Sequence, residues 1–202
     1  MKGYKDLAHS VRYEKRGENF VVAVKDQTLI HLGTGRSACA FRILESDKVI
    51  KIYYPQFSHL AKEEAEIYKK LESIPSFPLL YEAGDNYIVI DYIEGQTLFQ
   101  CLTRGDVIDQ HVIMEIDQAL LEVSRRHLNP SDIHLHNLIL TPQGKIMIID
   151  PARFNQQNDC NQWNDLKAAY HKYYTKRLFP KRMPAVLLDS IRLLYKRKLI
   201  KI

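Results

Sequence analysis

The sequence predicts an α+β fold in two parts, a β-rich N-terminal part with one helix and a mostly helical C-terminal part with one hairpin. Two observations predict it. Short runs rich in β-branched and aromatic residues recur as far as residue 93, broken by one helical segment. From residue 94 onward, apolar residues recur mainly at spacings of three and four. A chain of 202 residues is long enough to bury a substantial core.

The N-terminal part is predicted to contain five strands and one helix. The predicted strands are 20–24, 28–32, 40–44, 49–53 and 87–90. The helix is predicted over 59–73, because good helix formers follow Ser58, a candidate N-cap, and Pro75 and Pro78 end the segment.

A lysine and a glutamate in this part are candidate functional residues. Strand alternation places Lys51 on the face opposite Ile50 and Ile52. The apolar positions of the helix centre on Glu64, so this acid faces inward. A buried carboxylate needs a cation, and Lys51 is the candidate. The alternatives are a surface lysine and a glutamate that reaches water from the helix edge.

The C-terminal part is predicted to be helical around one hairpin. Its predicted helices cover 107–126, about 163–177 and 184–198, and its predicted strands cover 138–140 and 145–149. Thr141-Pro142-Gln143-Gly144 joins the two strands as a turn.

Three polar residues are expected at the open end of that hairpin. Asn137 precedes the first strand and Asp150 follows the second, so antiparallel pairing sets them together. Asp132 lies in the loop that leads to the same end. Such oxygen ligands suit Mg²⁺, with phosphate completing its shell. The alternative is that the acids cap turns.

A further candidate is Gly33-Thr34-Gly35, between two predicted strands. Two glycines allow the backbone to approach a phosphate closely, although the same pattern also makes an ordinary tight hairpin.

The order of these features along the chain resembles that of the protein-kinase superfamily. The features are the glycine turn, the strand lysine, the helix glutamate, Asp-x-x-x-x-Asn and the final aspartate. The likeness covers about residues 28–175 and is greatest to small atypical kinases of the RIO type and to short predicted serine/threonine kinases of Bacillus-like bacteria. It implies one bilobal kinase-like domain over 1–202. The N-lobe with its hinge would cover 1–93, and a truncated C-lobe with basic C-terminal helices would cover 94–202.

The resemblance also implies roles for individual residues. It places ATP against the backbone of the glycine turn and of a hinge, at Gly33, Thr34, Gly35, Asp91 and Ile93. Lys51 would hold the α- and β-phosphates and pair with Glu64. Asp132 would be the catalytic base, and Asn137 and Asp150 would hold Mg²⁺.

Some positions depart from the kinase pattern. His134, a further candidate catalytic residue, stands where kinases often carry a lysine, and it would be a weaker phosphate partner. With His136 it could form a zinc pair, although no third ligand is evident. Asp165 resembles an aspartate that braces the catalytic loop of kinases, and alternatively it is a helix N-cap.

Three functions from different classes fit these residues. The leading hypothesis is ATP- and Mg²⁺-dependent transfer to a Ser or Thr hydroxyl of an unidentified protein substrate. The second is a small-molecule kinase of the aminoglycoside or choline type, for which the chain offers little room. The third is a nucleotide-binding pseudokinase, or an ATPase module of a complex.

Charge and cysteine usage bear on partners and location. Residues 167–202 carry a net charge of +10, and the rest of the chain carries −5. This tail predicts an acidic protein or RNA-containing partner, or else a solvated helical face. Three widely spaced cysteines, a charged N-terminus and no apolar run of roughly 18 residues predict a soluble, cytoplasmic chain without a membrane span.

Overall fold

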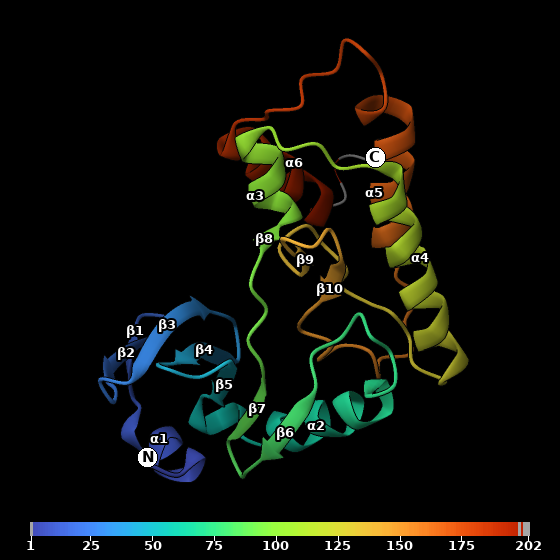
Figure 1. Ribbon diagram of the computed structural model, residues 1–202. Coiled ribbons are helices and arrows are strands. Elements are labelled where there is room, and N and C mark those ends of the chain that lie inside the picture. Colours follow the sequence, from blue (N-terminus) through green and yellow to red (C-terminus); the bar gives the residue numbers. More distant parts are fainter. Residues whose placement is uncertain (1, 198, 200–202) are drawn as a thin grey trace. The chain divides into compact units, whose positions relative to one another are not determined.

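The structure is a computed structural model that describes residues 2–197 and 199 (Figure 1). The chain divides into two compact units, Met1–Ile93 and Glu94–Ile202.

The N-terminal unit is built on a five-stranded antiparallel sheet with the strand order β3-β4-β5-β7-β6. Its strands are β3 (Leu29–Thr34), β4 (Ala38–Ile43), β5 (Lys48–Tyr53), β6 (Leu80–Ala83) and β7 (Tyr87–Asp91). A separate hairpin, formed by β1 (Arg12–Arg16) and β2 (Asn19–Val24), precedes the sheet. The five predicted strands are confirmed. The sequence did not predict β1, which is highly charged, or β6, which is only four residues long.

The N-terminal unit has more helix than the single helix predicted. The predicted one is α2 (Leu60–Leu71), which follows the 3₁₀ turn η1 (Pro55–Phe57). A further helix, α1 (Tyr4–Ser10), spans only seven residues, too few to show a clear apolar period. The N-cap assignment of Ser58 is wrong, because Ser58 closes η1 and His59 occupies the N-cap position.

The two faces of the sheet bury different clusters, because alternate residues of β5 point to opposite sides. Ile50 and Ile52 are fully buried in a cluster that includes Leu7 of α1. Val49 and Tyr53 belong to the second cluster, which includes Ala65 of α2. The period-2 pattern of one strand therefore places Lys51 on the face that α2 covers.

The C-terminal unit combines helices with a small three-stranded sheet of order β10-β9-β8. Its elements are β8 (Gln96–Thr97), α3 (Leu98–Arg104), α4 (Gln110–Arg125), β9 (Leu138–Leu140), β10 (Ile146–Ile148), α5 (Gln162–Ala169), the π-helical turn η2 (Tyr170–Tyr174) and α6 (Ala185–Lys196). The predicted hairpin is confirmed as β9 and β10. The sequence did not predict α3, although Thr97 and Gln100 form a capping box at its start.

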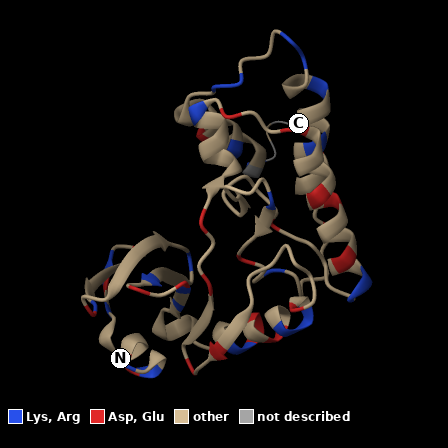
Figure 2. Cartoon of the chain, viewed as in Figure 1, with Lys and Arg blue, Asp and Glu red and all other residues tan. Residues whose placement is uncertain are grey.

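The predicted C-terminal helices differ from the observed ones mainly at their ends. The predicted helix 163–177 is α5 followed by η2, and 184–198 corresponds to α6. Residues 198 and 200–202 of the basic tail lie outside the described residues. Figure 2 shows Lys and Arg recurring from α5 to the loop before α6. Within the described part of the chain, no helix is both long and apolar enough to cross a membrane.

Candidate active site

The N-terminal unit joins Lys51 to Glu64. Lys51 Nζ lies 2.9 Å from Glu64 Oε1 and 2.8 Å from Glu64 Oε2. Glu64 is 1% exposed, and the Lys51 side chain is 15% exposed. Tyr53, two residues along β5, donates its hydroxyl to Glu64 Oε2 at 2.5 Å. The structure thus excludes both alternatives, the surface lysine and the glutamate that reaches water.

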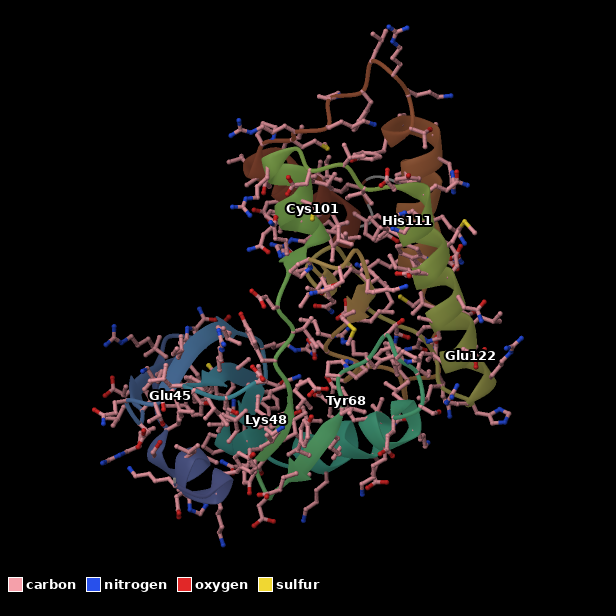
Figure 3. All side chains as sticks on the ribbon, in the orientation of Figure 1. Glu45, Lys48, Tyr68, Cys101, His111 and Glu122 are labelled. Atoms are coloured by element: carbon pink, nitrogen blue, oxygen red, sulfur yellow. The ribbon has the colours of Figure 1, made fainter. Side chains whose placement is uncertain are left out.

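Helix α2 presents Glu64 to the sheet because the carboxylate stands within its apolar stripe. Ala61 and Ala65 flank Glu64 and are buried, and Tyr68 (Figure 3) is 1% exposed one turn later. Burial makes the charge of Glu64 costly unless a cation and hydrogen-bond donors compensate it. Lys51 and Tyr53 supply both, which fixes the Lys51 ammonium group in one position.

The glycine turn is a closed hairpin turn between β3 and β4. Gly35 N–H donates to the Ala38 carbonyl oxygen at 2.8 Å, and the Tyr54 hydroxyl donates to the Gly35 carbonyl oxygen at 3.0 Å. A Cβ added to Gly33 would meet nothing within 4 Å. The local structure is therefore that of a tight hairpin, with open space at Gly33. Binding of phosphate by Gly33, Thr34 and Gly35 stays a prediction.

The predicted hinge begins at the last residue of β7. The Asp91 carboxylate is engaged locally, because it accepts hydrogen bonds from Leu79 N–H at 2.8 Å and from the Tyr81 hydroxyl at 2.7 Å. Asp91 N–H donates to the Leu79 carbonyl oxygen at 3.2 Å. The backbone of Ile93 makes no hydrogen bond to any residue that the structure describes. Adenine binding at Asp91 and Ile93 stays a prediction.

The C-terminal unit brings the polar residues of the hairpin together. Ile148 pairs with Leu138, and one step further out Ile149 N–H donates to the Asn137 carbonyl oxygen at 2.9 Å. Asn137 thus lies beside the residue that precedes Asp150, as antiparallel pairing predicts. The Asn137 side chain donates from Nδ2 to the Asp132 carbonyl oxygen at 3.3 Å.

These residues fit a magnesium ion. Because Asn137 Nδ2 is used as a donor, Asn137 Oδ1 could serve as an oxygen ligand, and Asp150 could add a carboxylate. Mg²⁺ is commonly held by one or two such groups together with waters and phosphate oxygens. Among the residues described, no three His, Cys, Asp or Glu side chains are grouped as a metal site. An ion bound here would therefore complete its shell with phosphate and water.

Asp132 lies in an unusual backbone conformation beside an arginine. Its φ is +60°, a left-handed value that is uncommon for residues other than glycine. The preceding Ser131 is buried and donates to the Asn129 carbonyl oxygen at 3.0 Å. Arg153 Nε lies 3.6 Å from Asp132 Oδ2. The Asp132 side chain is 32% exposed, so it is partly accessible from outside the protein.

The two histidines after Asp132 take part in aromatic packing. His136 stacks on Phe99 with ring centroids 4.2 Å apart, and His134 meets His136 edge-on at 5.9 Å. Both line a cavity of about 470 Å³ within the C-terminal unit. A zinc pair gains no third ligand among the described residues. A catalytic role for His134 stays a prediction.

Asp165 neither caps its helix nor contacts the loop around Asp132, the two roles that the sequence suggested for it. It lies inside α5, whose N-cap position is Asn161, so the N-cap alternative is wrong. Its carboxylate accepts a hydrogen bond from the Tyr195 hydroxyl of α6 at 2.5 Å rather than bracing the loop around Asp132. Burial, with this hydrogen bond, raises the pKa of Tyr195 to about 12.

Sequence reasoning missed three residues of the site. Tyr53 could have been found, because alternation along β5 puts it on the same face as Lys51. Asn129 donates from Nδ2 to the carbonyl oxygens of Gln156 and Asn158, which holds the segment after Asp150. Neither Asn129 nor Arg153 lies in a periodic element, so no repeating pattern signals them.

Comparisons with known proteins agree with the kinase likeness. A protein of Bacillus subtilis (strain 168), "Putative serine/threonine-protein kinase YrzF", is 42% identical over 193 residues, which are 95% of this chain and 90% of that protein. Among solved structures, the kinase PK-1 of Cydia pomonella granulovirus matches with a TM-score of 0.50 and 20% identity. That match covers 62% of this chain and 50% of the viral kinase, so it supports the fold alone. No protein-family model matches the chain.

Proposed function

The chain belongs to the kinase family of the Bacillus subtilis protein YrzF, and on that premise we propose that it transfers the γ-phosphoryl group of ATP to a Ser or Thr hydroxyl of a protein. Residues 1–202 would act as one kinase-like domain, with 1–93 as N-lobe and hinge and 94–202 as a minimal C-lobe. The name of the relative supports the choice of a protein hydroxyl.

The contact between Lys51 and Glu64 carries the proposal. A lysine whose ammonium group is held by both oxygens of a buried carboxylate is fixed in position. Phosphoryl transfer depends mainly on such positioned charges, because little covalent chemistry is left for the protein. In the proposal, Lys51 binds the α- and β-phosphates.

The backbone would supply the other nucleotide contacts. Amides of the glycine turn, at Gly33, Thr34 and Gly35, would lie against the phosphates. The Asp91 carbonyl and the Ile93 backbone would bind the adenine edge. The absence of any partner for the Ile93 backbone among the described residues supports this assignment.

The C-terminal unit would hold the metal and orient the acceptor. Asn137 Oδ1 and the Asp150 carboxylate would hold Mg²⁺, which neutralises charge on the phosphate oxygens when it is bound. Asp132 would accept the proton of the acceptor hydroxyl, and its partial exposure supports that role. His134 would stand beside the base.

A radiolabelled-ATP assay on wild type and Asp150→Ala tests the proposal. Label on protein supports it, and the variant should lose turnover while its circular dichroism and melting temperature stay near those of wild type. Label on a small molecule would show that the acceptor is a small molecule rather than a protein. No transfer, with thermal stabilisation by nucleotide, would identify a nucleotide-binding module instead.

One observation favours the second candidate, a small-molecule kinase. The sequence offered little room for a small-molecule pocket, yet the C-terminal unit contains the cavity of about 470 Å³, lined by His134 and His136 among others. Asp132 is not among its lining residues, so the cavity does not by itself present an acceptor to the proposed base. For this reason the protein hydroxyl remains the first choice.

Location and a second partner complete the proposal. ATP as co-substrate and three free cysteines fit the cytoplasm. The basic tail 167–202 would bind an acidic protein or an RNA-containing partner. Exposure of Lys176, Arg177 and Arg182 supports this, because exposed cations attract such surfaces.

A further inference from the structure

The loop after Asp150 is anchored on both sides of Arg153. Phe154 is 1% exposed, and its N–H donates to the Pro151 carbonyl oxygen at 2.9 Å. The Phe154 carbonyl oxygen in turn accepts a hydrogen bond from Asn129 N–H at 2.7 Å. The backbone of Arg153 is therefore held next to the loop that carries Asp132, whatever the side chain does.

The Arg153 side chain is partly exposed, although its backbone is held. It is 45% exposed, and its shortest distance to the Asp132 carboxylate, from Nε to Oδ2, is 3.6 Å, which is longer than a hydrogen bond. Within the described part of the chain, no other cation lies within 4.0 Å of the Asp132 carboxylate. An ion pair that is this long and this exposed contributes little to stability. The anchored backbone thus places an exposed guanidinium group beside Asp132 in a contact that adds little to stability.

The position of this guanidinium group coincides with the place where the reaction would occur. A hydroxyl that gives its proton to Asp132 must lie about 2.6–3.2 Å from a carboxylate oxygen. The phosphorus that it attacks must lie about 3–3.5 Å beyond that hydroxyl. A guanidinium group 3.6 Å from Oδ2 is within this range, so it must either move aside or contact the phosphoryl group.

We propose that Arg153 binds the γ-phosphoryl group of ATP. When nucleotide and acceptor are bound, its guanidinium group moves away from Asp132 and contacts the phosphate oxygens. The inference rests on the proposed function. A planar guanidinium group with five donors suits phosphate oxygens, whereas its 3.6 Å approach to Asp132 is too long for a hydrogen bond.

In the transfer step, the acceptor oxygen forms a bond to the γ-phosphorus as the bond to the bridging β–γ oxygen breaks. That electron pair leaves with ADP, and the acceptor proton passes to the Asp132 carboxylate. Arg153 neither gains nor loses a proton, and its fixed charge faces the oxygens of the group in transit.

Nucleotide binding tests the proposal without requiring turnover. Titration calorimetry with Mg²⁺ compares ADP with a non-hydrolysable ATP analogue for wild type, Arg153→Ala and Arg153→Lys. The matched control is Arg125→Ala, which removes an exposed arginine that pairs with Glu122 on α4. We expect Arg153→Ala to bind ADP as wild type does and to bind the analogue roughly 10- to 100-fold more weakly, with Arg153→Lys in between. Equal loss for both nucleotides, or no loss, overturns the proposal.

Turnover provides the second measurement. Arg153→Ala should transfer phosphate about 10²- to 10³-fold more slowly, and added guanidinium ion should restore part of that rate while equal tetramethylammonium does not. Absence of rescue by guanidinium would overturn the proposal. Wild type that binds the analogue but transfers no phosphate would refute the proposed function, and the binding comparison would still decide the role of Arg153. Wild type that binds neither nucleotide would refute both.

Discussion

Replacing Lys51 with methionine leaves the Glu64 carboxylate buried without its cation. Methionine keeps most of the length and apolar stem of lysine, so the packing beside Tyr53 changes little. Glu64 would retain the Tyr53 hydroxyl as a donor, but its 1% exposure prevents water from replacing the lost charge.

The expected loss of stability is large for one substitution. Removing one partner of a buried ion pair lowers the free energy of unfolding by about 3–5 kcal/mol, because the remaining charge stays desolvated. In a chain of this size, each kcal/mol lowers the melting temperature by about 2–4 °C, so Lys51→Met should melt roughly 6–20 °C below wild type.

Urea unfolding followed by circular dichroism would measure this loss against two further variants. Lys62→Met removes an exposed lysine from α2, the helix that carries Glu64, where Lys62 lies 3.6 Å from Asp85. This variant should change the free energy of unfolding by less than about 0.5 kcal/mol. Lys51→Met combined with Glu64→Gln removes the uncompensated charge and keeps an acceptor for Tyr53. The double variant should therefore recover at least half of the loss.

Two results would refute this reasoning. If Lys51→Met cost no more than Lys62→Met, the Glu64 carboxylate would not depend on Lys51. If adding Glu64→Gln recovered nothing, lost packing rather than a buried charge would cause the destabilisation.

Four other predictions concern single features. Asp150→Ala should abolish phosphoryl transfer with little change in melting temperature, as measured by radiolabel and thermal scan, whereas a retained rate would contradict its metal role. Tyr53→Phe, which removes a donor to the buried carboxylate of α2, should cost about 1–3 kcal/mol in urea unfolding. Gly95→Ala would set a Cβ 2.5 Å from a β9 carbonyl oxygen and should cost about 1–3 kcal/mol, as a melting curve would show. Lys176→Glu combined with Arg177→Glu should lower the salt concentration at which the chain elutes from a heparin column. Unchanged elution would mean that these two cations bind no polyanion.

Strand and helix periodicity predicted the parts of the site that lie on regular elements. Alternation along 49–53 and the apolar stripe of 59–73 together brought Lys51 and Glu64 to one interface. The hairpin argument placed Asn137 beside the end of its partner strand. Each inference used a repeat distance that holds along the whole element, so an error of one or two residues at the ends did not matter.

Periodicity could not predict contacts made by irregular segments. Arg153 reaches Asp132 because Phe154 and Asn129 fix the loop between β10 and α5, and none of these contacts follows from sequence spacing. Asp165 shows the same limit, because its partner Tyr195 lies 30 residues away on a different helix. A correct helix prediction therefore gave the wrong contact for the one acid on it.

Two acids of the proposed site have strained backbones. This strain indicates that function, rather than stability, explains why an aspartate stands at each position. Asp132 and Asp150 have φ values of +60° and +59°, and they are two of the four described non-glycine residues with positive φ. Such conformations are adopted more readily by glycine, and each strained residue costs of order 1–3 kcal/mol. Glycine at either position would relieve the backbone but remove a carboxylate. Both acids stand at the proposed base and metal-ligand positions, so the proposed function gives a reason for a carboxylate rather than glycine at each strained position.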